Sequence, residues 1–152
     1  MKNYYIIDFD STFTQVEALD ELARISLENN PNREQILKDI EGFTNLAMEG
    51  KISFRESLAG RVTLLQANKE HLEKLIKHLK KKVSKSFDRN REFFKQNAET
   101  VLIVSGGFKE FITPVVSRYG ILEKNIYANT FKFDEQGQII GYDENNPLSY
   151  EG

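Results

Sequence analysis

Two short apolar runs, far apart in the chain, place the strongest constraint on its fold. They read YYIID at residues 4–8 and TVLIVSGG at residues 100–107, and each has the length and β-branched content of a buried strand. A helical pattern follows each run, and buried strands that alternate with helices are typical of a parallel sheet. Because ligands bind beyond the carboxyl ends of the strands in such sheets, the residues after each run are candidates for a site.

The long segment between the two runs has almost continuous helical periodicity. Apolar residues recur every three or four positions in four stretches, 16–27, 36–46, 54–65 and 72–79. Gly50 and Asn68 lie at breaks between these stretches. We therefore expect a small antiparallel helical bundle that packs as a separate lobe over the sheet.

The rest of the chain is expected to return to the sheet and complete the core. The stretch FDRNREFFKQN at 87–97 is predicted to be one helix with Asp88 as its N-cap. After the second strand, a further helix should end near Gly120. Alternation in TFKFD and QIIGYD on either side of EQG predicts a β-hairpin.

Composition excludes several classes of protein. The 21 basic and 23 acidic residues nearly cancel, and the lysine-rich stretch at 77–85 has no interleaved aromatic residues, so we expect a solvated helix surface and no nucleic-acid partner. There is no cysteine, which excludes disulfides and thiolate chemistry. No stretch approaches the ~20 apolar residues of a membrane span. We expect a cytoplasmic protein with no membrane contact.

The first run ends on two carboxylates, Asp8 and Asp10, followed by Ser11 and Thr12. One carboxylate can attack phosphorus while it binds a divalent cation, and the second can give a proton to the leaving oxygen. Mg²⁺ requires oxygen ligands, which carboxylates supply. Aspartate, serine and threonine are also common turn residues and N-caps, so the pair by itself is also compatible with a structural turn.

The second run ends in Ser105, Gly106 and Gly107, directly before a helical pattern. Exposed backbone N–H groups at a strand-to-helix turn favour an anion, and a serine hydroxyl adds a donor. Together the two strand ends supply a nucleophile, a proton shuttle and a cradle for phosphate. This combination predicts the active site of a phosphatase.

The order of these motifs resembles that of a phosphoserine phosphatase of the haloacid dehalogenase superfamily. The matching segments are DFDST at 8–12, MEGKISFRESLAGRV at 48–62, VSGGF at 104–108 and YANTF at 127–131. The resemblance covers nearly the whole chain. It implies an α/β fold in which a Rossmannoid parallel-sheet core at 1–14 and 86–152 carries an inserted helical-bundle cap at 15–85.

The resemblance also implies roles for individual residues. Asp8 would be the nucleophile that forms an aspartyl phosphate, Asp10 would be the general acid and base, and Mg²⁺ would be bound by Asp8 and the backbone carbonyl of Asp10. Phosphate would lie against Ser105 and Gly106. The remaining predicted substrate contacts are Glu17 with the ammonium group, Arg61 with the carboxylate, and Met48 with Phe54 as pocket walls. A guanidinium suits a carboxylate and an acid suits an amine, although Arg61, Met48 and Phe54 also fit ordinary helix surface and core positions.

Two features of the family pattern have no counterpart in the sequence. The family has a lysine shortly after the hairpin and then a Gly-Asp-Gly turn with acidic magnesium ligands, whereas Lys109, Lys124 and Lys132 lie before or within the hairpin. We therefore expect the core sheet to be incomplete at the C-terminus and the chain to be a truncated phosphatase with little activity, because a phosphoryl-transfer site depends on charge neutralisation.

Three functions stay open at the level of sequence. The first is a Mg²⁺-dependent phosphoserine phosphatase of serine biosynthesis, which could be part of a longer protein fused to a phosphoglycerate dehydrogenase. The second is a phosphatase for another small phosphomonoester, such as phosphohomoserine or phosphoethanolamine. The third is a non-catalytic fragment that binds phosphate or a partner chain, for which an open sheet edge would also permit a homo-oligomer.

Overall fold

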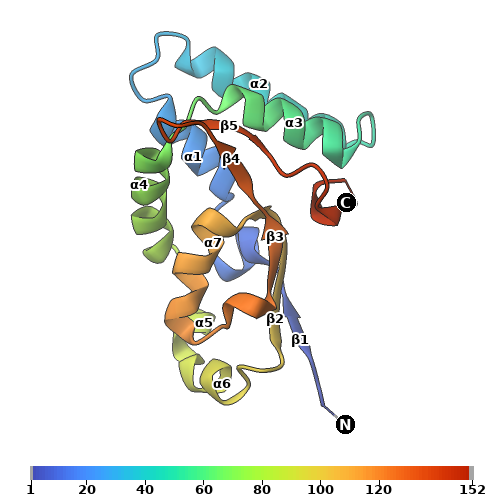
Figure 1. Cartoon of the computed structure of the whole chain (residues 1–152), viewed down its shortest axis with the longest axis vertical. Coiled ribbons are helices and arrows are strands. Elements are labelled where there is room, and N and C mark those ends of the chain that lie inside the picture. The colour runs from blue at the N-terminus through green and yellow to red at the C-terminus, as the bar shows by residue number, and fades with distance from the viewer. Residues whose placement is uncertain (1, 151–152) are drawn as a thin grey trace.

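The computed structural model describes residues 2–150 and contains a three-stranded parallel sheet. Its strands are β1 (Tyr5–Ile7), β2 (Val101–Phe108) and β3 (Ile126–Asn129), and they lie in the order β1-β2-β3. Tyr5 pairs with Val101 and Ile103 pairs with Ile126, so β2 is the central strand. The carboxyl ends of the strands point toward the helical end of the molecule (Figure 1).

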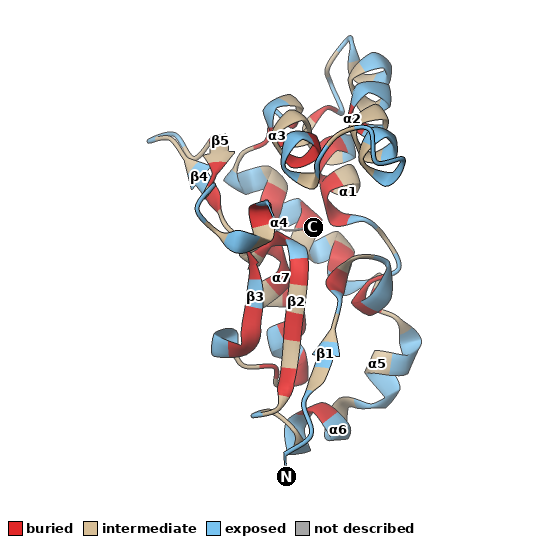
Figure 2. Ribbon diagram, turned by 90° about the vertical axis from the view of Figure 1, so that its right-hand side faces the viewer, coloured by how far each residue is buried: buried red, intermediate tan, exposed pale blue. Residues whose placement is uncertain are grey.

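The sheet differs from the prediction in two respects. Strand β3 was not predicted, since IYAN is only four residues long and lacks an extended apolar run. Strand β1 was expected to be buried, but it lies at the edge of the three-stranded sheet (Figure 2). Ile6, at its centre, is 70% exposed. An apolar run indicates that a strand can be buried, but only the neighbouring elements determine whether it is.

Four helices form the segment predicted to be a bundle. They are α1 (Ala18–Ser26), α2 (Arg33–Met48), α3 (Phe54–Leu64) and α4 (Lys69–Lys80). Capping boxes start two of them: Ser53 with Glu56 at α3, and Asn68 with His71 at α4. Helices α2 and α3 lie side by side at the end of the molecule farthest from the N-terminus (Figure 1).

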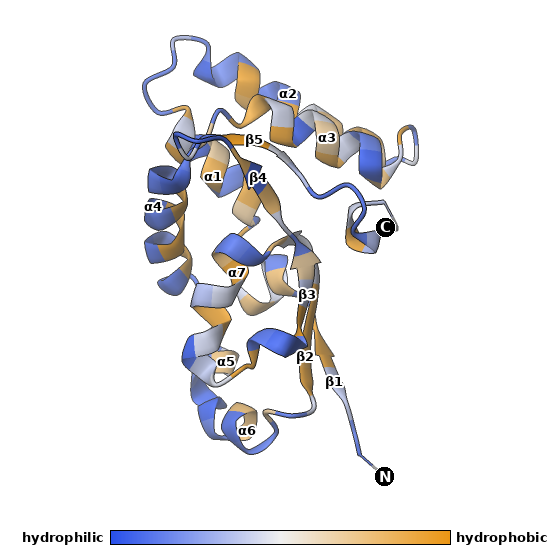
Figure 3. Cartoon of the chain, viewed as in Figure 1, coloured by the Kyte–Doolittle hydropathy of each residue, from blue (hydrophilic) through white to orange (hydrophobic). Residues whose placement is uncertain are grey.

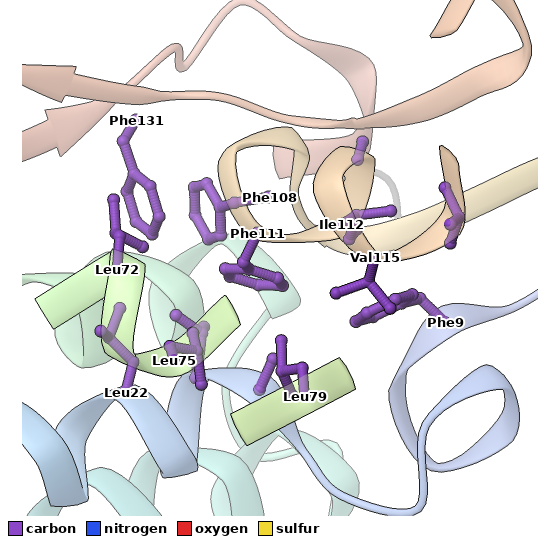
Figure 4. Close-up of a cluster of buried hydrophobic side chains, with 14 of the residues drawn as sticks. Phe9, Leu22, Leu72, Leu75, Leu79, Phe108, Phe111, Ile112, Val115 and Phe131 are labelled. Atoms are coloured by element: carbon purple, nitrogen blue, oxygen red, sulfur yellow. The ribbon is translucent and has the colours of Figure 1, made fainter. Parts of the chain in front are cut away.

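The other two helices of this segment share a hydrophobic core with the sheet region. Leu22 of α1, Leu75 of α4 and Phe111 of α7 (Lys109–Val116) belong to one cluster of buried side chains, which also contains Phe108 and Phe131 (Figure 4). The outer face of α4 is hydrophilic, whereas its apolar face is turned toward the core (Figure 3). Packing is therefore continuous from α4 to α7.

The segment that returns the chain to the sheet is two helices rather than one. Helices α5 (Lys85–Arg89) and α6 (Arg91–Gln96) meet at Asn90, whose φ of −109° and ψ of 26° leave the helical region. Asp88 is not an N-cap, because it lies inside α5 and accepts a hydrogen bond from the Tyr119 hydroxyl at 2.6 Å. The break turns α6, so that Phe94 packs in the core while the exposed Asp88 faces Tyr119.

The predicted hairpin is present as β4 (Phe131–Phe133) and β5 (Ile139–Tyr142), which pair antiparallel. Gly137 adopts a φ of +81° in its turn, a conformation that favours glycine. Backbone hydrogen bonds from Ile139 to Ala67 and from Lys69 to Gly137 attach the hairpin to the start of α4.

Short helical turns complete the structure. They lie at Phe9–Phe13, Ser117–Tyr119, Glu123–Asn125 and Pro147–Ser149. Gly120 ends the helical stretch after β2 with a φ of +82°, as predicted. Within residues 2–150, no helix combines the length and the apolar character that crossing a membrane requires.

Candidate active site

Asp8 and Asp10 lie in the turn at the carboxyl end of β1. The side chains of Phe9 and Phe13 are fully buried and anchor this turn, while Asp8 is exposed and Asp10 is half-buried. One Asp8 oxygen, Oδ1, accepts a hydrogen bond from the Phe9 N–H at 2.7 Å. Oδ1 of Asp10 accepts one from the Ala18 N–H at 2.8 Å, at the start of α1. The two carboxyl groups are thus held by backbone donors.

Ser11, the next residue in the turn, links it to Glu17. Ser11 has a φ of +56°, which is uncommon for a residue with a side chain. Its hydroxyl donates a hydrogen bond to Glu17 Oε1 at 2.6 Å. This contact holds the Glu17 carboxylate beside the two aspartates.

The second wall of the site is the turn at the carboxyl end of β2. The buried Ser105 Oγ accepts a hydrogen bond from the Gly107 N–H at 2.9 Å. A methyl group at Gly106 would come within 2.8 Å of Phe54 Cζ, and one at Gly107 would lie 3.3 Å from Asp10 Oδ2. Both glycines therefore allow a close approach, one to the Phe54 ring on α3 and one to the Asp10 carboxyl group.

These residues line a single cavity of about 230 Å³ between the strand ends and helices α1, α2 and α3. Its lining includes seven of the eight predicted site residues, namely Asp8, Asp10, Glu17, Phe54, Arg61, Ser105 and Gly106. The structure does not bring Met48 to this cavity, because its side chain is 82% exposed at the end of α2. Met48 belongs to a polar helix end here, and the apolar wall is provided by Phe54 and Leu19.

Four lining residues were not predicted: Leu19, Asp20, Thr44 and Gly107. A sequence signal existed for Asp20, because it lies three positions after Glu17 and so falls on nearly the same face of a helix. Gly107 adjoins the predicted Gly106. Thr44 had no local signal, because only the packing of α2 against α3 brings it to the cavity.

The cavity is strongly acidic. Four carboxyl groups, those of Asp8, Asp10, Glu17 and Asp20, line it together with one guanidinium, that of Arg61. Burial raises the pKa of Asp10 to about 7, and the nearby carboxylates act in the same direction, while the Ala18 hydrogen bond and Arg61 oppose them. A carboxyl group with this pKa holds a proton over part of the neutral range, as a general acid must. Burial likewise raises the pKa of Asp20 and lowers that of Arg61.

The donor set fits a loosely held Mg²⁺. Magnesium usually binds through one or two carboxylates and completes its shell with water and substrate phosphate. Asp8 and Asp10 line the same cavity and provide carboxylate and carbonyl oxygens for such a site. Within residues 2–150, no three or more acidic or histidine side chains are grouped in a way that could enclose a metal ion.

No family model matches the chain. Individual proteins of known sequence or structure do match it, and several of them are phosphoserine phosphatases. The chloroplastic phosphoserine phosphatase of Arabidopsis thaliana is 32% identical over 145 residues, 95% of this chain and 46% of that protein. The crystal structure of a phosphoserine phosphohydrolase-like protein from Francisella tularensis subsp. tularensis SCHU S4 is 29% identical, with a TM-score of 0.84 over 98% of this chain and 68% of that one. A substrate-bound phosphoserine phosphatase complex is 27% identical, with a TM-score of 0.67 over 93% and 63%.

The fold is therefore that of the haloacid dehalogenase superfamily, with cap-like helices over a partial parallel sheet, as predicted. In sequence and structure the chain is similar to phosphoserine phosphatases, which hydrolyse phosphoric monoesters, and the predicted resemblance is confirmed. The chain spans about half the length of the curated relatives it matches, 46% of the plant protein and 61% of the one from Homo sapiens.

Proposed function

We propose that this chain carries the nucleophile and the substrate-binding half of a Mg²⁺-dependent phosphoserine phosphatase. The observation that carries the proposal is the shared cavity, in which Asp8, Asp10 and the Ser105 turn face Glu17 and Arg61. Two sheet strands supply groups for phosphoryl transfer, and two helices supply groups of opposite charge. Such a division suits a phosphate ester that also bears an amine and a carboxylate.

The proposed reaction has two steps. First, an Asp8 oxygen attacks phosphorus, the bond from phosphorus to the serine oxygen breaks, and Asp10 gives its proton to that oxygen. Because Oδ1 of Asp8 is engaged by the Phe9 N–H, we assign the attack to Oδ2. In the second step, Asp10 takes a proton from a water molecule that attacks the aspartyl phosphate, which releases phosphate and restores Asp8.

Charge neutralisation is the main requirement of this reaction. With four carboxyl groups and one guanidinium, the cavity needs additional positive charge before it can accept a phosphate dianion. Bound Mg²⁺, held by Asp8 and the Asp10 carbonyl, would supply that charge and polarise the phosphoryl group. The Ser105 hydroxyl and the Gly106 N–H would donate hydrogen bonds to the phosphoryl oxygens, because the Gly107 N–H already donates to Ser105 Oγ.

Substrate recognition is assigned to the helices. Arg61 on α3 would bind the carboxylate of the substrate, and the Glu17 carboxylate would bind its ammonium group. Phosphohomoserine has both groups on a longer side chain, and phosphoethanolamine lacks the carboxylate, so both remain alternative substrates to be compared with phosphoserine. A cytoplasmic location, a role in serine biosynthesis and fusion to a phosphoglycerate dehydrogenase belong to the same proposal.

Trapping of the phosphoenzyme tests this proposal directly. The chain is mixed with ³²P-labelled L-phosphoserine and Mg²⁺ and quenched in acid, and the label is then released with hydroxylamine, which cleaves acyl phosphates. We expect label on the parent chain and on an Asp39→Asn control, whose substituted residue lies on the exposed face of α2, but none on Asp8→Asn. Equal labelling of Asp8→Asn, or hydroxylamine-resistant label, would overturn the assignment of Asp8.

A specific observation also favours a second function, the binding of a partner chain. An open hollow of about 500 Å³ lies along the free edge of β1, lined by residues that include Tyr5, Ile6, Phe87 and Phe93. Exposed apolar side chains beside an unpaired strand edge favour pairing with another strand. The partner would be a second copy of this chain, giving a homo-oligomer. Analytical ultracentrifugation of the parent chain and of Ile6→Lys tests this function. The parent chain should form a dimer whose population rises with concentration, and Ile6→Lys should remain a monomer.

A further inference from the structure

Regular pairing between β2 and β3 is interrupted at the glycine turn. Val104 pairs with Tyr127 and Phe108 pairs with Asn129, so three residues of β2, 105–107, lie opposite the single residue Ala128. The backbone groups in this stretch of β2 cannot all find partners in the ladder, although much of it is buried. Another group must therefore hold the turn.

The side chain of Asn129 is the group that holds the turn. Its amide nitrogen donates one hydrogen bond to the Gly106 carbonyl at 3.0 Å and a second to the Leu148 carbonyl at 3.1 Å. Both hydrogens of the amide are thus used. Asn129 is fully buried, and its side-chain oxygen has no hydrogen-bond partner within residues 2–150. The two bonds from its nitrogen are therefore what offsets the free-energy cost of burying the amide. An asparagine at the buried end of a strand therefore needs a specific partner, and the Gly106 carbonyl is one.

The hydrogen bond to Gly106 determines the orientation of a whole peptide unit. The Gly106 carbonyl and the Gly107 N–H belong to one planar trans peptide, so they point in opposite directions. Asn129 holds the carbonyl end, and the N–H end donates to Ser105 Oγ at 2.9 Å. When Ser105 Oγ accepts this bond, its own hydrogen is free to be donated to an anion in the cavity that Ser105, Gly106 and Gly107 line.

We propose that Asn129 is a positioning residue for the phosphate cradle: its amide, by holding the Gly106 carbonyl, aims the Ser105 hydroxyl at the bound phosphoryl group. The proposal rests on the proposed function for the identity of the anion. The orientation of the Gly106–Gly107 peptide is a property of the free protein and can be measured without any ligand. Asn129 acts through the turn and does not line the cavity itself.

The chain contains a matched control. Asn125 is also buried, precedes the same strand, and donates its side-chain amide to a backbone carbonyl, that of Ala98, at 3.0 Å. Its partner lies near the start of β2, at the end of the sheet opposite the cavity. Replacement of Asn125 thus removes the same kind of hydrogen bond without touching the glycine turn.

Nuclear magnetic resonance on the ¹⁵N,¹³C-labelled chain tests the proposal in two stages. In the parent chain, couplings through the hydrogen bonds should connect the Asn129 side-chain nitrogen with the Gly106 and Leu148 carbonyl carbons. In Asn129→Leu, the Gly106 and Gly107 amide signals should move strongly, whereas in Asn125→Leu they should not. With inorganic phosphate and Mg²⁺ added, Asn129→Leu should bind phosphate about 10-fold more weakly, as expected for one lost hydrogen bond.

Asn129→Asp adds a test that depends on pH. If Asn129 acts as a hydrogen-bond donor to the turn, the glycine signals of this variant should recover at low pH, whereas a variant that only disturbs packing should show no recovery. A protonated aspartic acid can donate to the Gly106 carbonyl, and the carboxylate cannot. The Gly107 amide signal of this variant should therefore return toward the parent position as the pH is lowered, without a change in Asn125→Asp. Absence of the coupling to Gly106, or unchanged glycine signals in Asn129→Leu, overturns the role of Asn129. If the parent chain binds no phosphate while these glycine signals respond as expected, the proposed function fails and the positioning of the turn stands.

Discussion

The Asp10 carboxyl group accepts a hydrogen bond from the backbone N–H of Ala18, the first residue of α1, at 2.8 Å. Glu17, at the N-cap of this helix, makes no side-chain capping hydrogen bond. Asp10 therefore satisfies one of the free N–H groups of the helix from eight positions away, and its negative charge also suits the helix N-terminus. One side chain serves both the candidate site and the start of α1.

The double role of Asp10 predicts different stabilities for two inactive variants. Asp10→Asn keeps an oxygen that can accept from Ala18, and Asp10→Ala does not. We expect Asp10→Ala to have a free energy of unfolding lower than that of Asp10→Asn by about 1 kcal/mol, the usual value of an N-cap. Urea denaturation of the metal-free chains measures the difference. Equal midpoints would show that the capping bond contributes nothing.

Close packing of Gly106 on Phe54 predicts a coupled pair. In Gly106→Ala the new methyl group would come within 2.8 Å of Phe54 Cζ, so the turn or the ring must move. We expect a loss of about 1 to 3 kcal/mol in the free energy of unfolding, and relief of at least part of it in the double variant with Phe54→Leu. Thermal and urea denaturation of all four chains measure the coupling, and additive losses would contradict the contact.

Gly42 provides the control for this substitution. It lies inside α2, and a methyl group added at this position would have no neighbouring atom within 4 Å. Because alanine is the better helix former, Gly42→Ala should raise the free energy of unfolding by about 0.5 to 1 kcal/mol. If the free energy of unfolding falls in Gly106→Ala and rises in Gly42→Ala, then contact with Phe54, and not the added methyl group itself, causes the loss.

Arg61 should discriminate between substrates with and without a carboxylate. Arg61→Gln removes the charged partner, and a charged hydrogen bond contributes about 1.5 to 3 kcal/mol, or about 10- to 150-fold in affinity. We expect this loss for L-phosphoserine and little change for phosphoethanolamine, measured by calorimetry with Mg²⁺ present. Because both ligands bind the same variant, a general loss of folding would weaken both alike. Equal weakening of the two ligands would contradict the assigned contact.

The hydrogen bond from Tyr119 to Asp88 predicts a pH-dependent stability. This bond lowers the pKa of Asp88 from its ordinary value of 3.8, so its contribution is present above pH 3.8 and is lost as the pH falls through the lower folded value. Burial and the same bond raise the pKa of Tyr119 to about 12, so its contribution is lost as the pH rises from 10 to 12. Tyr119→Phe should therefore be less stable than the parent at pH 7, by about 0.5 to 1 kcal/mol because Asp88 is exposed.

Comparison of the parent and Tyr119→Phe from pH 2 to pH 11 measures this difference, which should shrink toward both ends. Tyr142→Phe is the control, because the buried Tyr142 hydroxyl has no hydrogen-bond partner within residues 2–150. Loss of that hydroxyl should leave stability unchanged or slightly increased below pH 10, whereas above pH 10 the parent should become less stable than Tyr142→Phe, because burial raises the pKa of Tyr142. A constant deficit for Tyr119→Phe across the pH range would show that Asp88 is not the source of the effect.

Local patterns in the sequence were sufficient for much of the fold. Apolar periodicity and the residues that break it are properties of neighbouring positions, so α2, α3 and α4 and the hairpin were predicted close to their observed bounds. The same reasoning failed at Asn90, because the apolar pattern at 87–97 continues through a point where the backbone turns. On either side of that turn, Phe87 packs on Phe13 and Phe94 packs on Tyr119, and both partners are distant in the sequence.

The sequence by itself determined which residues stand at the ends of β1 and β2, because a change from an apolar run to acids, serine and glycine is readable within ten residues. Only the tertiary structure decided which distant side chains join them. It brought Asp20 and Thr44 to the cavity, left Met48 in solvent, exposed Ile6 at the sheet edge, and placed the Asn129 amide on the Gly106 carbonyl. These outcomes depend on how helices and strands pack across long separations, and the free energy of that packing is shared among many residues rather than encoded in a local pattern.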